Sequence, residues 1–547
     1  MFRKSIHSFL QHFPKFMAML IAGSFFISCA DSHPKSLPDP VEAPLTIKVN
    51  ASNYNNILYV ARKTGNDTTG AGSRKEPYRS IKKAMENINN AAAQNRYAIF
   101  VSEGEYIVES TIPMKSFVDL FGGFSEKNWE RDVREHKTIL DGHLKTRILM
   151  GTDNARLDGF VITKGAIRGK GAGIYCDGVS PTISNNVFVN NHTFKPERWH
   201  PKFWHETAND GGAIYLANGA SPQIEHNLFI SNRTENGRGA GIAADNHCKP
   251  VIKDNVFFDN VAGSDDPMRS SDGGAISIFK WSQADVEHNI IQSNRALNHN
   301  DAGGVWIALW TSATVKNNII VDNEADDDAG GIFVGGQEHR YDRPLDKMPS
   351  ADSFFVDIEN NTIIGNRNRS MNSGAIRFTM ESRGLFKNNI TAHNNGVYFQ
   401  RSEAKILGNV ILDNFLLVET KKYLGEYIVA DNLFGADYDQ QIAAKVTRNN
   451  MMHPPKGTDN YWKIPEFVDD GLTLKVASSN YFPQNYYTEM FLFNTSMRPN
   501  ELANRVLKIG DRWSVVRSNS ETSVTLWGNF AGEVSMTVLP TYRLRGK

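Results

Sequence analysis

The chain has 547 residues, in which 60 lysines and arginines balance 60 aspartates and glutamates, so its formal net charge at neutral pH is zero. A balanced charge produces no field that would attract a nucleic acid or an anionic surface. The sequence contains only 3 cysteines, which argues against a cysteine-based metal site. We therefore expect a monomeric scaffold with no nucleic-acid partner.

The N-terminal segment is typical of a secretion signal. Basic residues precede the apolar stretch MAMLIAGSFFIS, which is short for a membrane span. The stretch runs into Phe-Ile-Ser-Cys, which resembles a bacterial lipoprotein box. We predict a signal peptide over residues 1–28 and a lipid on Cys29, which would place the protein at the bacterial outer membrane or cell surface. An uncleaved signal anchor is the alternative. The proline-rich residues 29–56 are predicted to be a tether.

The middle of the chain is repetitive. The spacing Asn-x4-Asn occurs eight times around short runs rich in Val, Ile and Phe: Asn186/Asn191, Asn227/Asn232, Asn255/Asn260, Asn289/Asn294, Asn318/Asn323, Asn361/Asn366, Asn389/Asn394 and Asn409/Asn414. A unit with one small apolar segment cannot bury a core alone and must stack on its neighbours. The runs have no helical period, so the pattern predicts a solenoid of parallel strands in which the asparagines form ladders at the corners.

A glycine pair opens most coils, and the distance from it to the next Asn pair is nearly constant, which indicates rigid scaffold. The segment between the second Asn and the next glycine pair varies in length. Loops of variable length therefore lie along one edge of the stack, where a solenoid usually binds its ligand.

Several segments carry a resemblance to a known family. The entrance YVARKTGNDTTGAGSRKEPYRSIKKAMENI (59–88), then FGGFSE (121–126), ILDG (139–142), LDGFVIT (157–163) and IPEFVDDGLTL (464–474), are similar to right-handed parallel β-helix proteins of the pectate-lyase-like superfamily. The resemblance implies an all-β fold over residues 57–484, capped by a helix over 80–93. The resemblance predicts the fold specifically. It says little about the reaction, because the superfamily includes lyases, hydrolases, epimerases and adhesins.

After about residue 485 the repeat stops. RWSVV, SVTLW and EVSMTVL predict strands of a small C-terminal β module over residues 485–547 that caps or flanks the last coil. Trp513 and Trp527 alternate with apolar residues and fit a core better than a sugar-binding surface. Cys176 and Cys248 fall two coils apart, roughly 9.6 Å, so we expect free buried thiols.

The variable loops contain the candidate binding residues. The loop over 192–210 includes Trp199, Trp204 and His205, whose rings suit stacking on sugars, although a loop folded back on the helix would also bury them. This loop and the insert over 337–352 are predicted to wall a glycan-binding groove. Arg233 and Arg369 are further candidates for contact with the substrate.

Acidic residues cluster on consecutive loops. Asp301 and the run Asp326, Asp327 and Asp328 could share a hard cation such as Ca²⁺, as the resemblance to calcium-dependent pectate lyases also implies. Solvated loop acids are the simpler interpretation.

The candidate catalytic residues are His299, Arg295, Arg367 and Asp301. They suit a lyase acting on an acidic polysaccharide at the bacterial surface. A glycoside hydrolase with paired carboxylates, such as Asp301 with Asp272 or Asp327, is the first alternative. A glycan-binding or adhesive surface protein without activity is the second.

Overall fold

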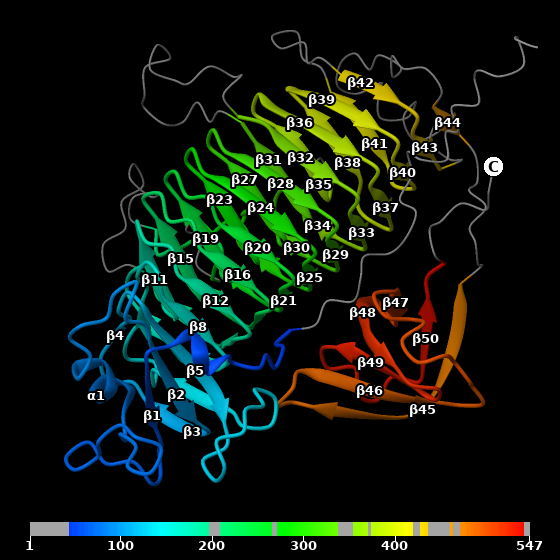
Figure 1. The fold of residues 1–547 in the computed structure, drawn as a ribbon. Helices are drawn as coiled ribbons and strands as arrows, with labels where there is room; N and C mark the ends of the chain where they lie inside the picture. Colours follow the sequence, from blue (N-terminus) through cyan, green and yellow to red (C-terminus); the bar gives the residue numbers. More distant parts are fainter. Residues whose placement is uncertain are drawn as a thin grey trace, which may run out of the picture.

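The computed structural model describes residues 43–195, 208–264, 271–336, 354–369, 374–418, 427–435, 460–462 and 471–540. These residues form a long stack of parallel β-coils and, beside it, a small closed antiparallel barrel (Figure 1). The predicted all-β solenoid is therefore confirmed. The signal peptide and Cys29 lie outside the described residues, and no helix among the described ones is long and apolar enough to cross a membrane.

Each complete coil contributes one strand to each of four parallel sheets, which we number in chain order. Within the described residues, sheet 1 has 13 strands: β1 (Asn56–Val60), β2 (Tyr97–Ser102), β5 (Val118–Phe124), β8 (Arg156–Asp158), β12 (Thr182–Ser184), β16 (Gln223–Glu225), β20 (Val251–Lys253), β24 (Gln283–Glu287), β28 (Ser312–Lys316), β32 (Val356–Glu359), β36 (Ser382–Lys387), β39 (Ser402–Leu407) and β42 (Tyr427–Ala430). Sheet 2 also has 13 there: β3 (Gly104–Ile107), β6 (Thr138–Asp141), β9 (Phe160–Thr163), β13 (Val187–Val189), β17 (Leu228–Ile230), β21 (Val256–Phe258), β25 (Ile290–Gln292), β29 (Ile319–Val321), β33 (Thr362–Ile364), β37 (Ile390–Ala392), β40 (Val410–Ile411), β43 (Leu433–Phe434) and β44 (Tyr461–Trp462).

Sheets 3 and 4 complete the coil. Over the described ranges, sheet 3 has 7 short strands: β10 (Ala166–Ile167), β14 (His192–Thr193), β18 (Arg233–Thr234), β22 (Val261–Ala262), β26 (Arg295–Ala296), β30 (Glu324–Ala325) and β34 (Arg367–Asn368). Sheet 4 has 11 in the same ranges: β4 (Ile112–Pro113), β7 (Leu149–Met150), β11 (Ile174–Asp177), β15 (Ile214–Ala217), β19 (Ile242–Asp245), β23 (Ile276–Phe279), β27 (Val305–Ala308), β31 (Ile332–Gly335), β35 (Ile376–Thr379), β38 (Val397–Gln400) and β41 (Phe415–Val418). The variable loops connect sheet 3 to sheet 4.

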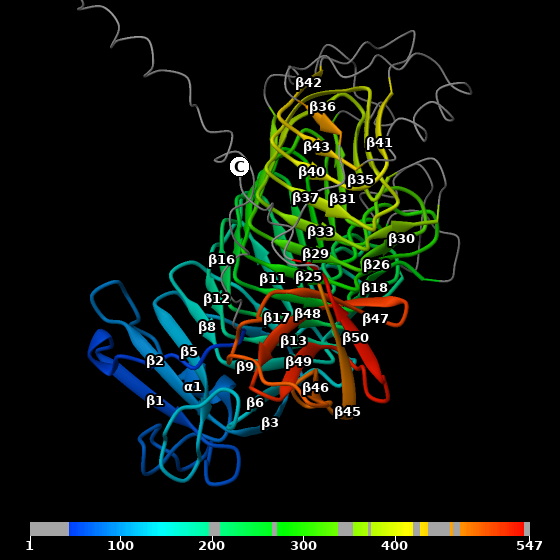
Figure 2. The same ribbon diagram turned by 90° about the vertical axis from the view of Figure 1, so that its right-hand side faces the viewer.

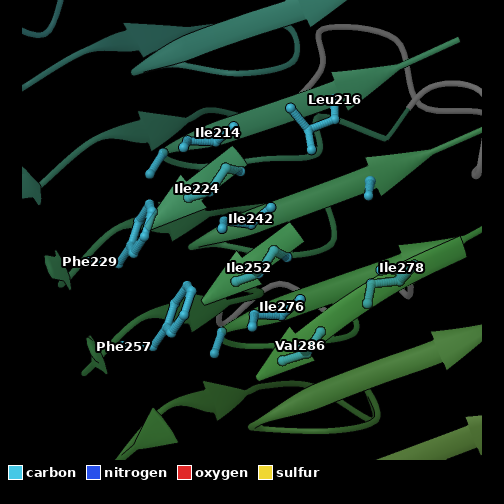
Figure 3. Close-up of a cluster of buried hydrophobic side chains, with 14 of the residues drawn as sticks. Ile214, Leu216, Ile224, Phe229, Ile242, Ile252, Phe257, Ile276, Ile278 and Val286 are labelled. Atoms are coloured by element: carbon cyan, nitrogen blue, oxygen red, sulfur yellow. The ribbon is translucent and has the colours of Figure 1, made fainter. Parts of the chain in front are cut away.

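The core fills the inside of the coils with stacked columns of equivalent residues (Figure 3). In sheet 2, Phe188, Phe229 and Phe257 stack with ring centroids 5.0 and 4.6 Å apart. Cys176 and Cys248 are free, buried thiols as predicted. Every coil therefore buries its inward side chains only by contact with the coils above and below, which is the property that defines a solenoid.

The asparagines form two ladders at the corners that flank sheet 2. After the first Asn of each ladder, the Asn side-chain oxygen accepts hydrogen bonds from both the backbone N–H and the side-chain amide of the Asn one coil earlier, as Asn289 does from Asn255 at 2.9 and 3.1 Å. The residue before most ladder positions has positive φ, for example His288 at 53°. The first ladder continues past the predicted pairs to Asn432 and Asn460. The ladder prediction is thus confirmed, with one exception.

The exception is Asn414, which was predicted to end the second ladder. Asp413 occupies that position instead: its two carboxylate oxygens accept from the backbone N and Nδ2 of Asn394, at 2.8 and 2.6 Å. A carboxylate can accept both bonds, so sequence spacing alone does not identify which residue closes the ladder. Burial raises the pKa of Asp413 to about 6.

The replacement Asp413→Asn is expected to raise the free energy of unfolding at neutral pH by about 1–2 kcal/mol. The folded pKa, about 6, lies above the ordinary value of 3.8, so the folded state loses stability as pH rises between these values. An uncharged Asn avoids that loss, and the gain should vanish near pH 4. Urea denaturation at both pH values measures it. Asp285→Asn, at an exposed position of β24, is the control. An equal gain at both pH values would contradict this explanation.

The N-terminal cap is shorter than predicted. The helix α1 spans Ile81–Glu86 and not 80–93, with Ser80 as its N-cap. The Ser80 Oγ accepts a hydrogen bond from the backbone N–H of Lys83 at 3.1 Å. The asparagines that follow are poor helix formers, so the apolar residues beyond them do not extend the helix. Near this end, the 3-10 turn η2 (Ala51–Asn53) belongs to the segment that precedes β1.

The C-terminal barrel consists of β45 (Leu472–Phe482), β46 (Tyr487–Leu492), β47 (Val506–Ile509), β48 (Arg512–Asn519), β49 (Ser523–Trp527) and β50 (Ser535–Val538). The predicted boundary at residue 485 is too late, and the LTL of 464–474 is not part of a last coil, because β45 already pairs antiparallel with β46 and β50. The strands predicted over 508–538 are confirmed.

The barrel packs against the outward side of sheet 2 and not over the last coil (Figures 1 and 2). Gln292 in β25 is fully buried, donates to Trp527 O at 3.2 Å and accepts from Val515 N at 3.1 Å. At Gly365 a Cβ atom would lie 2.4 Å from Cδ1 of Trp513. Trp513 and Trp527 are interface and core residues, as their alternation indicated.

Candidate functional site

The outward sides of the three long sheets differ in chemistry. On sheet 1, equivalent positions of successive strands alternate in charge: Glu225, Lys253, Glu287, Lys316, Glu359 and Lys387. Lys316 pairs with Glu359 at 3.3 Å. Such a row of alternating charges suits a face in contact with solvent. The outward side of sheet 2 is covered by the barrel. Of the three long sheets, sheet 4 alone has an outward side that is neither a row of alternating charges nor covered by the barrel.

The outward side of sheet 4, which we call the aromatic face, contains large rings. In β27, Val305 and Ile307 point into the core, whereas Trp306 joins a second apolar cluster with Tyr215 and Phe333. The glycine pairs allow these strands to stack closely: at Gly304 a Cβ atom would lie 2.4 Å from the backbone oxygen of Gly331. Trp306 is only 4% exposed, and its Nε1 has no hydrogen-bond partner among the described residues.

A stack of rings borders the aromatic face where sheet 4 ends. His247, Trp281 and Trp310 occupy equivalent corners, with ring centroids 5.5 and 5.2 Å apart and planes within 15° and 9°. All three residues have positive φ, near 60°. The rings thus extend the aromatic face around the corner toward sheet 1.

A column of acids borders the aromatic face on the side of the variable loops. Asp272, Asp301 and Asp328 lie in the loops just before three successive sheet 4 strands, β23, β27 and β31. The backbone N–H of Asp301 donates to Asp272 Oδ1 at 2.9 Å, and that of Asp328 donates to Asp301 Oδ1 at 3.0 Å. Asp328 also pairs with Arg377, which projects from β35. Three carboxyl groups therefore follow one another along the edge of the aromatic face.

Asp301 differs electrostatically from its neighbours. Its burial, together with the charges of Asp272 and Asp328, raises its pKa well above 3.8. Two adjacent carboxylates cannot both ionise freely at short range, so a proton is held more readily at Asp301, whose pKa is raised. A carboxylic acid beside ionised carboxylates can donate a proton to a bound molecule and accept one in turn.

The predicted arginines lie on sheet 3, across the variable loops from the acids. Arg295 pairs with Asp259 at 3.4 Å. Arg367 pairs with Asp322 and Glu324, and Arg369 pairs with Glu324 and Asp326. Each of these three side chains has an acidic partner on sheet 3, at the corner before it or in the loop after it, and none of these partners is Asp301. Arg233 lies in the same row, in β18.

His299 is exposed and lies two residues before Asp301 on the same loop, with φ of 59°. Of the other predicted catalytic side chains, only His299 lies on the same loop as Asp301, between β26 and β27.

The four aspartates predicted to bind calcium do not converge. Asp326 accepts from Asn298 N at 2.6 Å and pairs with Arg369, while Asp328 pairs with Arg377. Asp327 is held by its backbone, which donates to Asn300 O and accepts from Asn368 Nδ2. Across the described ranges, no group of three or more His, Cys, Asp or Glu side chains is arranged to hold a metal ion. Calcium dependence stays a prediction. Trp199, Trp204, His205 and the insert over 337–352 lie outside the described residues.

Sequence reasoning missed the aromatic face. The segments after the glycine pairs, such as GGVWIALW at 303–310, were interpreted as scaffold only. Their alternation places every second residue on the outside of the sheet, and large rings or charges at those positions were the available signal.

Two family models match the chain. One is described as "Right handed beta helix region" and matches residues 148–339, and the other as "Protein of unknown function (DUF1565)" and matches residues 63–200. No curated protein matches.

Solved structures with a similar fold share little sequence with the chain. "The complex structure of XylC with xylose" has 11% identity over 80% of this chain and 89% of that chain, with a TM-score of 0.26. "Rhamnogalacturonan lyase" has 13% identity over 69% and 87%, with a TM-score of 0.31. A tailspike protein mutant of E. coli bacteriophage HK620 in complex with pentasaccharide has 9% identity over 87% and 91%, with a TM-score of 0.22. At these values the likeness carries no argument about function.

Proposed function

We propose that this right-handed parallel β-helix protein binds a polysaccharide along the aromatic face of sheet 4 and cleaves a glycosidic bond beside Asp301. The partly buried rings of Tyr175 and Trp281, at the surface of the covered apolar cluster, suit contact with the apolar faces of sugars. The carboxyl groups of Asp272, Asp301 and Asp328 border the aromatic face and supply ionisable groups next to the bound polysaccharide. Binding and chemistry would then share one surface of the protein.

The raised pKa of Asp301 is the observation that carries this proposal. A hydrolase needs one protonated acid for the leaving oxygen and one ionised carboxylate for the anomeric carbon. Equivalent positions on successive coils lie about 4.8 Å apart, close to the roughly 5–5.5 Å separation typical of retaining enzymes. Asp301 would be the acid, and Asp328, which forms an ion pair with Arg377, the second carboxyl group.

β-Elimination is the second candidate reaction. It is favoured by the exposed His299 beside Asp301, because an imidazole can remove the proton next to a uronate carboxylate. The two reactions give different products. Elimination produces an unsaturated uronate that absorbs in the ultraviolet, whereas hydrolysis produces reducing ends only.

Incubation of the soluble protein with a panel of polysaccharides tests the proposal. Ultraviolet absorbance and reducing ends are followed with and without a chelator, and binding is measured separately. New reducing ends without absorbance support hydrolysis, and absorbance supports elimination. Loss of either activity with the chelator would support the calcium prediction. Binding without cleavage would leave a glycan-binding surface protein, and neither binding nor cleavage across the panel would reject the proposal.

Tyr175→Ala is expected to weaken binding of a recognised glycan about fivefold to tenfold. Tyr175 projects from β11 beside Tyr215 and is only partly buried, so a sugar can contact its ring, whereas Trp306 is covered. Affinity is measured by titration calorimetry and stability by thermal melting. Trp527→Phe changes a buried ring of the barrel and should leave affinity unchanged. Equal affinities for wild type and Tyr175→Ala would remove Tyr175 from the site.

We also propose that a lipid on Cys29 holds the protein at the bacterial surface, because the residues before it resemble a lipoprotein box. Labelling of cells with a fatty-acid analogue tests this: the wild type should carry the label and Cys29→Ser should not.

A further inference from the structure

The stack of rings at the corner between sheets 4 and 1 ends abruptly on its N-terminal side. The strand registers before and after this corner make Gly219 the equivalent of His247, Trp281 and Trp310, one coil before His247. At Gly219 an added Cβ atom would meet no atom within 4 Å beyond its neighbours in the chain. The outer face of the His247 ring is therefore turned toward open space, where the next side chain of the stack would stand.

The coil before Gly219 extends this open space. Residues 178–181 connect β11 to β12 there, and residues 218–222 connect β15 to β16, so the earlier corner is one residue shorter. It begins with Gly178, where an added Cβ atom would lie 3.5 Å from Asn218 O and closer to nothing else. Two successive coils thus have an exposed glycine beside the exposed ring of His247. We call Gly178, Gly219 and His247 the corner site.

The backbone of the corner does not by itself explain the glycine at 219. Its φ is 85°, and φ is 62° at His247 and 57° at Trp281. Residues with large rings therefore occupy the same left-handed region at the equivalent positions, and there is room for a side chain at 219. Open space that the coil does not require, next to an exposed ring, is better explained by a ligand than by folding.

A row of hydrogen-bonding side chains borders the corner site on the side of sheet 4. Asn246 Nδ2 donates to Asn218 Oδ1 at 2.7 Å, and Asn218 Nδ2 donates to Asp177 Oδ1 at 2.6 Å. Asp177 and Asn218 are exposed and Asn246 is half-buried, so a ligand can reach the row. The Tyr175 hydroxyl donates to Asp177 Oδ2 at 3.2 Å. The row thus connects the corner site to the aromatic face.

The chemistry of the corner site suits a sugar ring. The rings of the stack follow one another at 5.5 and 5.2 Å with nearly parallel planes, so a flat ligand one coil before His247 would continue the stack. A pyranose ring has an apolar face for such a contact and hydroxyl groups at its edge for the amides and the carboxylate of the row. Asp177 and the exposed Lys249, two residues after His247, have opposite charges and together do not select an anion.

We propose that the corner site binds a neutral sugar ring of the polysaccharide, stacked on the outer face of His247 and hydrogen-bonded to Asn218 and Asp177. This inference rests on the proposed function, because the same polysaccharide is the ligand, and it assigns to that ligand neutral sugar units. The corner site follows the strands of sheet 4, whereas Asp301 precedes β27. A polysaccharide that occupies both places crosses the aromatic face between them.

Filling the open space with a side chain tests the proposal. Neutral hexasaccharides of glucose, mannose, xylose and galactose are titrated into the soluble protein by calorimetry, and the wild type should bind at least one. Gly219→Trp places a ring on His247, as Trp281 does on the other side, and should lower that affinity about tenfold or more. Gly532→Trp is the matched control, because Gly532 of the barrel has a φ of 90° and equally open space around an added Cβ atom. It should leave the affinity unchanged.

Variants of His247 assign the effect to the ring. His247→Ala should lower the affinity for the neutral hexasaccharide about fivefold, and His247→Phe, which keeps a ring, should stay within about twofold of the wild type. Hexagalacturonate is the charged comparison, and Gly219→Trp should change its affinity less than about twofold. Thermal melting excludes unfolding. If Gly219→Trp melts early, Gly219→Asn replaces it, because asparagine tolerates positive φ, as Asn246 does at 63°.

The outcomes separate this inference from the proposed function. Equal affinities of the wild type and Gly219→Trp, or equal losses in Gly219→Trp and Gly532→Trp, overturn the corner site while glycan binding elsewhere stands. An equal loss for hexagalacturonate overturns the assignment to a neutral sugar. Binding of a polysaccharide without binding of any neutral hexasaccharide also overturns the corner site alone. No binding or cleavage of any glycan overturns the proposed function as well.

Discussion

Asp301→Asn is expected to reduce glycan cleavage by about 10²–10⁴-fold while the folded protein becomes more stable at neutral pH. The replacement removes the only proton that Asp301 could donate, and it keeps an oxygen that can accept from Asp328 N. Because burial and the charges of Asp272 and Asp328 raise the pKa of Asp301, the ionised form destabilises the fold at neutral pH. An uncharged Asn does not carry that cost. Turnover at saturating glycan and urea denaturation measure the two effects.

The stability gain of Asp301→Asn has a defined pH dependence. The folded pKa is raised, so the wild type loses stability as pH rises from the ordinary value of 3.8 through the folded value. The variant should therefore exceed the wild type at pH 7 and equal it below about pH 4. Asp285→Asn, at an exposed position of β24, is the matched control and should retain full activity. If Asp301→Asn cleaves glycan at the wild-type rate, the catalytic assignment is wrong.

Asn289→Ala is expected to lower the free energy of unfolding by about 3–5 kcal/mol. Asn289 is fully buried. Its oxygen accepts two hydrogen bonds from Asn255, and its Nδ2 donates to Ile252 O at 2.9 Å and Asn318 Oδ1 at 3.0 Å. Alanine leaves these buried partners unsatisfied, and water cannot replace the lost bonds inside the stack. Urea denaturation of the soluble protein measures the change.

Gln283→Ala, at the exposed start of β24, is the control and should change stability by less than about 0.5 kcal/mol. A similarly small change for Asn289→Ala would mean that strand pairing and the apolar columns hold the corner without the ladder. The coil would then tolerate many residues at the ladder positions.

The solenoid could be predicted because its determinants repeat locally. An Asn pair, a preceding residue that accepts positive φ and an apolar run between them specify one corner and one strand, and each copy meets an identical copy about 4.8 Å away. Asp413 shows the limit of this reasoning, because a carboxylate accepts the same two bonds as the amide that the spacing predicted at Asn414.

The barrel boundary and its docking surface depended on pairing between distant segments. β45 follows the last described coil in sequence, yet its partners β46 and β50 make it part of the barrel. The runs between paired asparagines are apolar at consecutive positions, which is compatible with burial of both sides of sheet 2. Tertiary contacts, such as those of Gln292 with β48 and β49, identify what covers the outward side.

The candidate site was predicted in part. Length variation at one edge located the acids, and Asp301 lies in that column as expected, whereas Arg295, Arg367 and Arg369 pair with acids on the other side of the loops. The charges of these residues could be read from the sequence, but their partners could not. An ion pair forms between whichever side chains the loop lengths bring within about 4 Å.

The amino-acid sequence by itself determined the coil, its corners and the edge on which the loops lie, because each depends on hydrogen bonds and burial between identical neighbours. The tertiary structure decided which side chains share the aromatic face. Tyr175, Tyr215 and Trp306 are more than 100 residues apart from first to last, and they belong to one apolar cluster only because the coils stack in one register and their strands place alternate residues outside. Electrostatic energies at that face depend on separations and burial that no local pattern encodes.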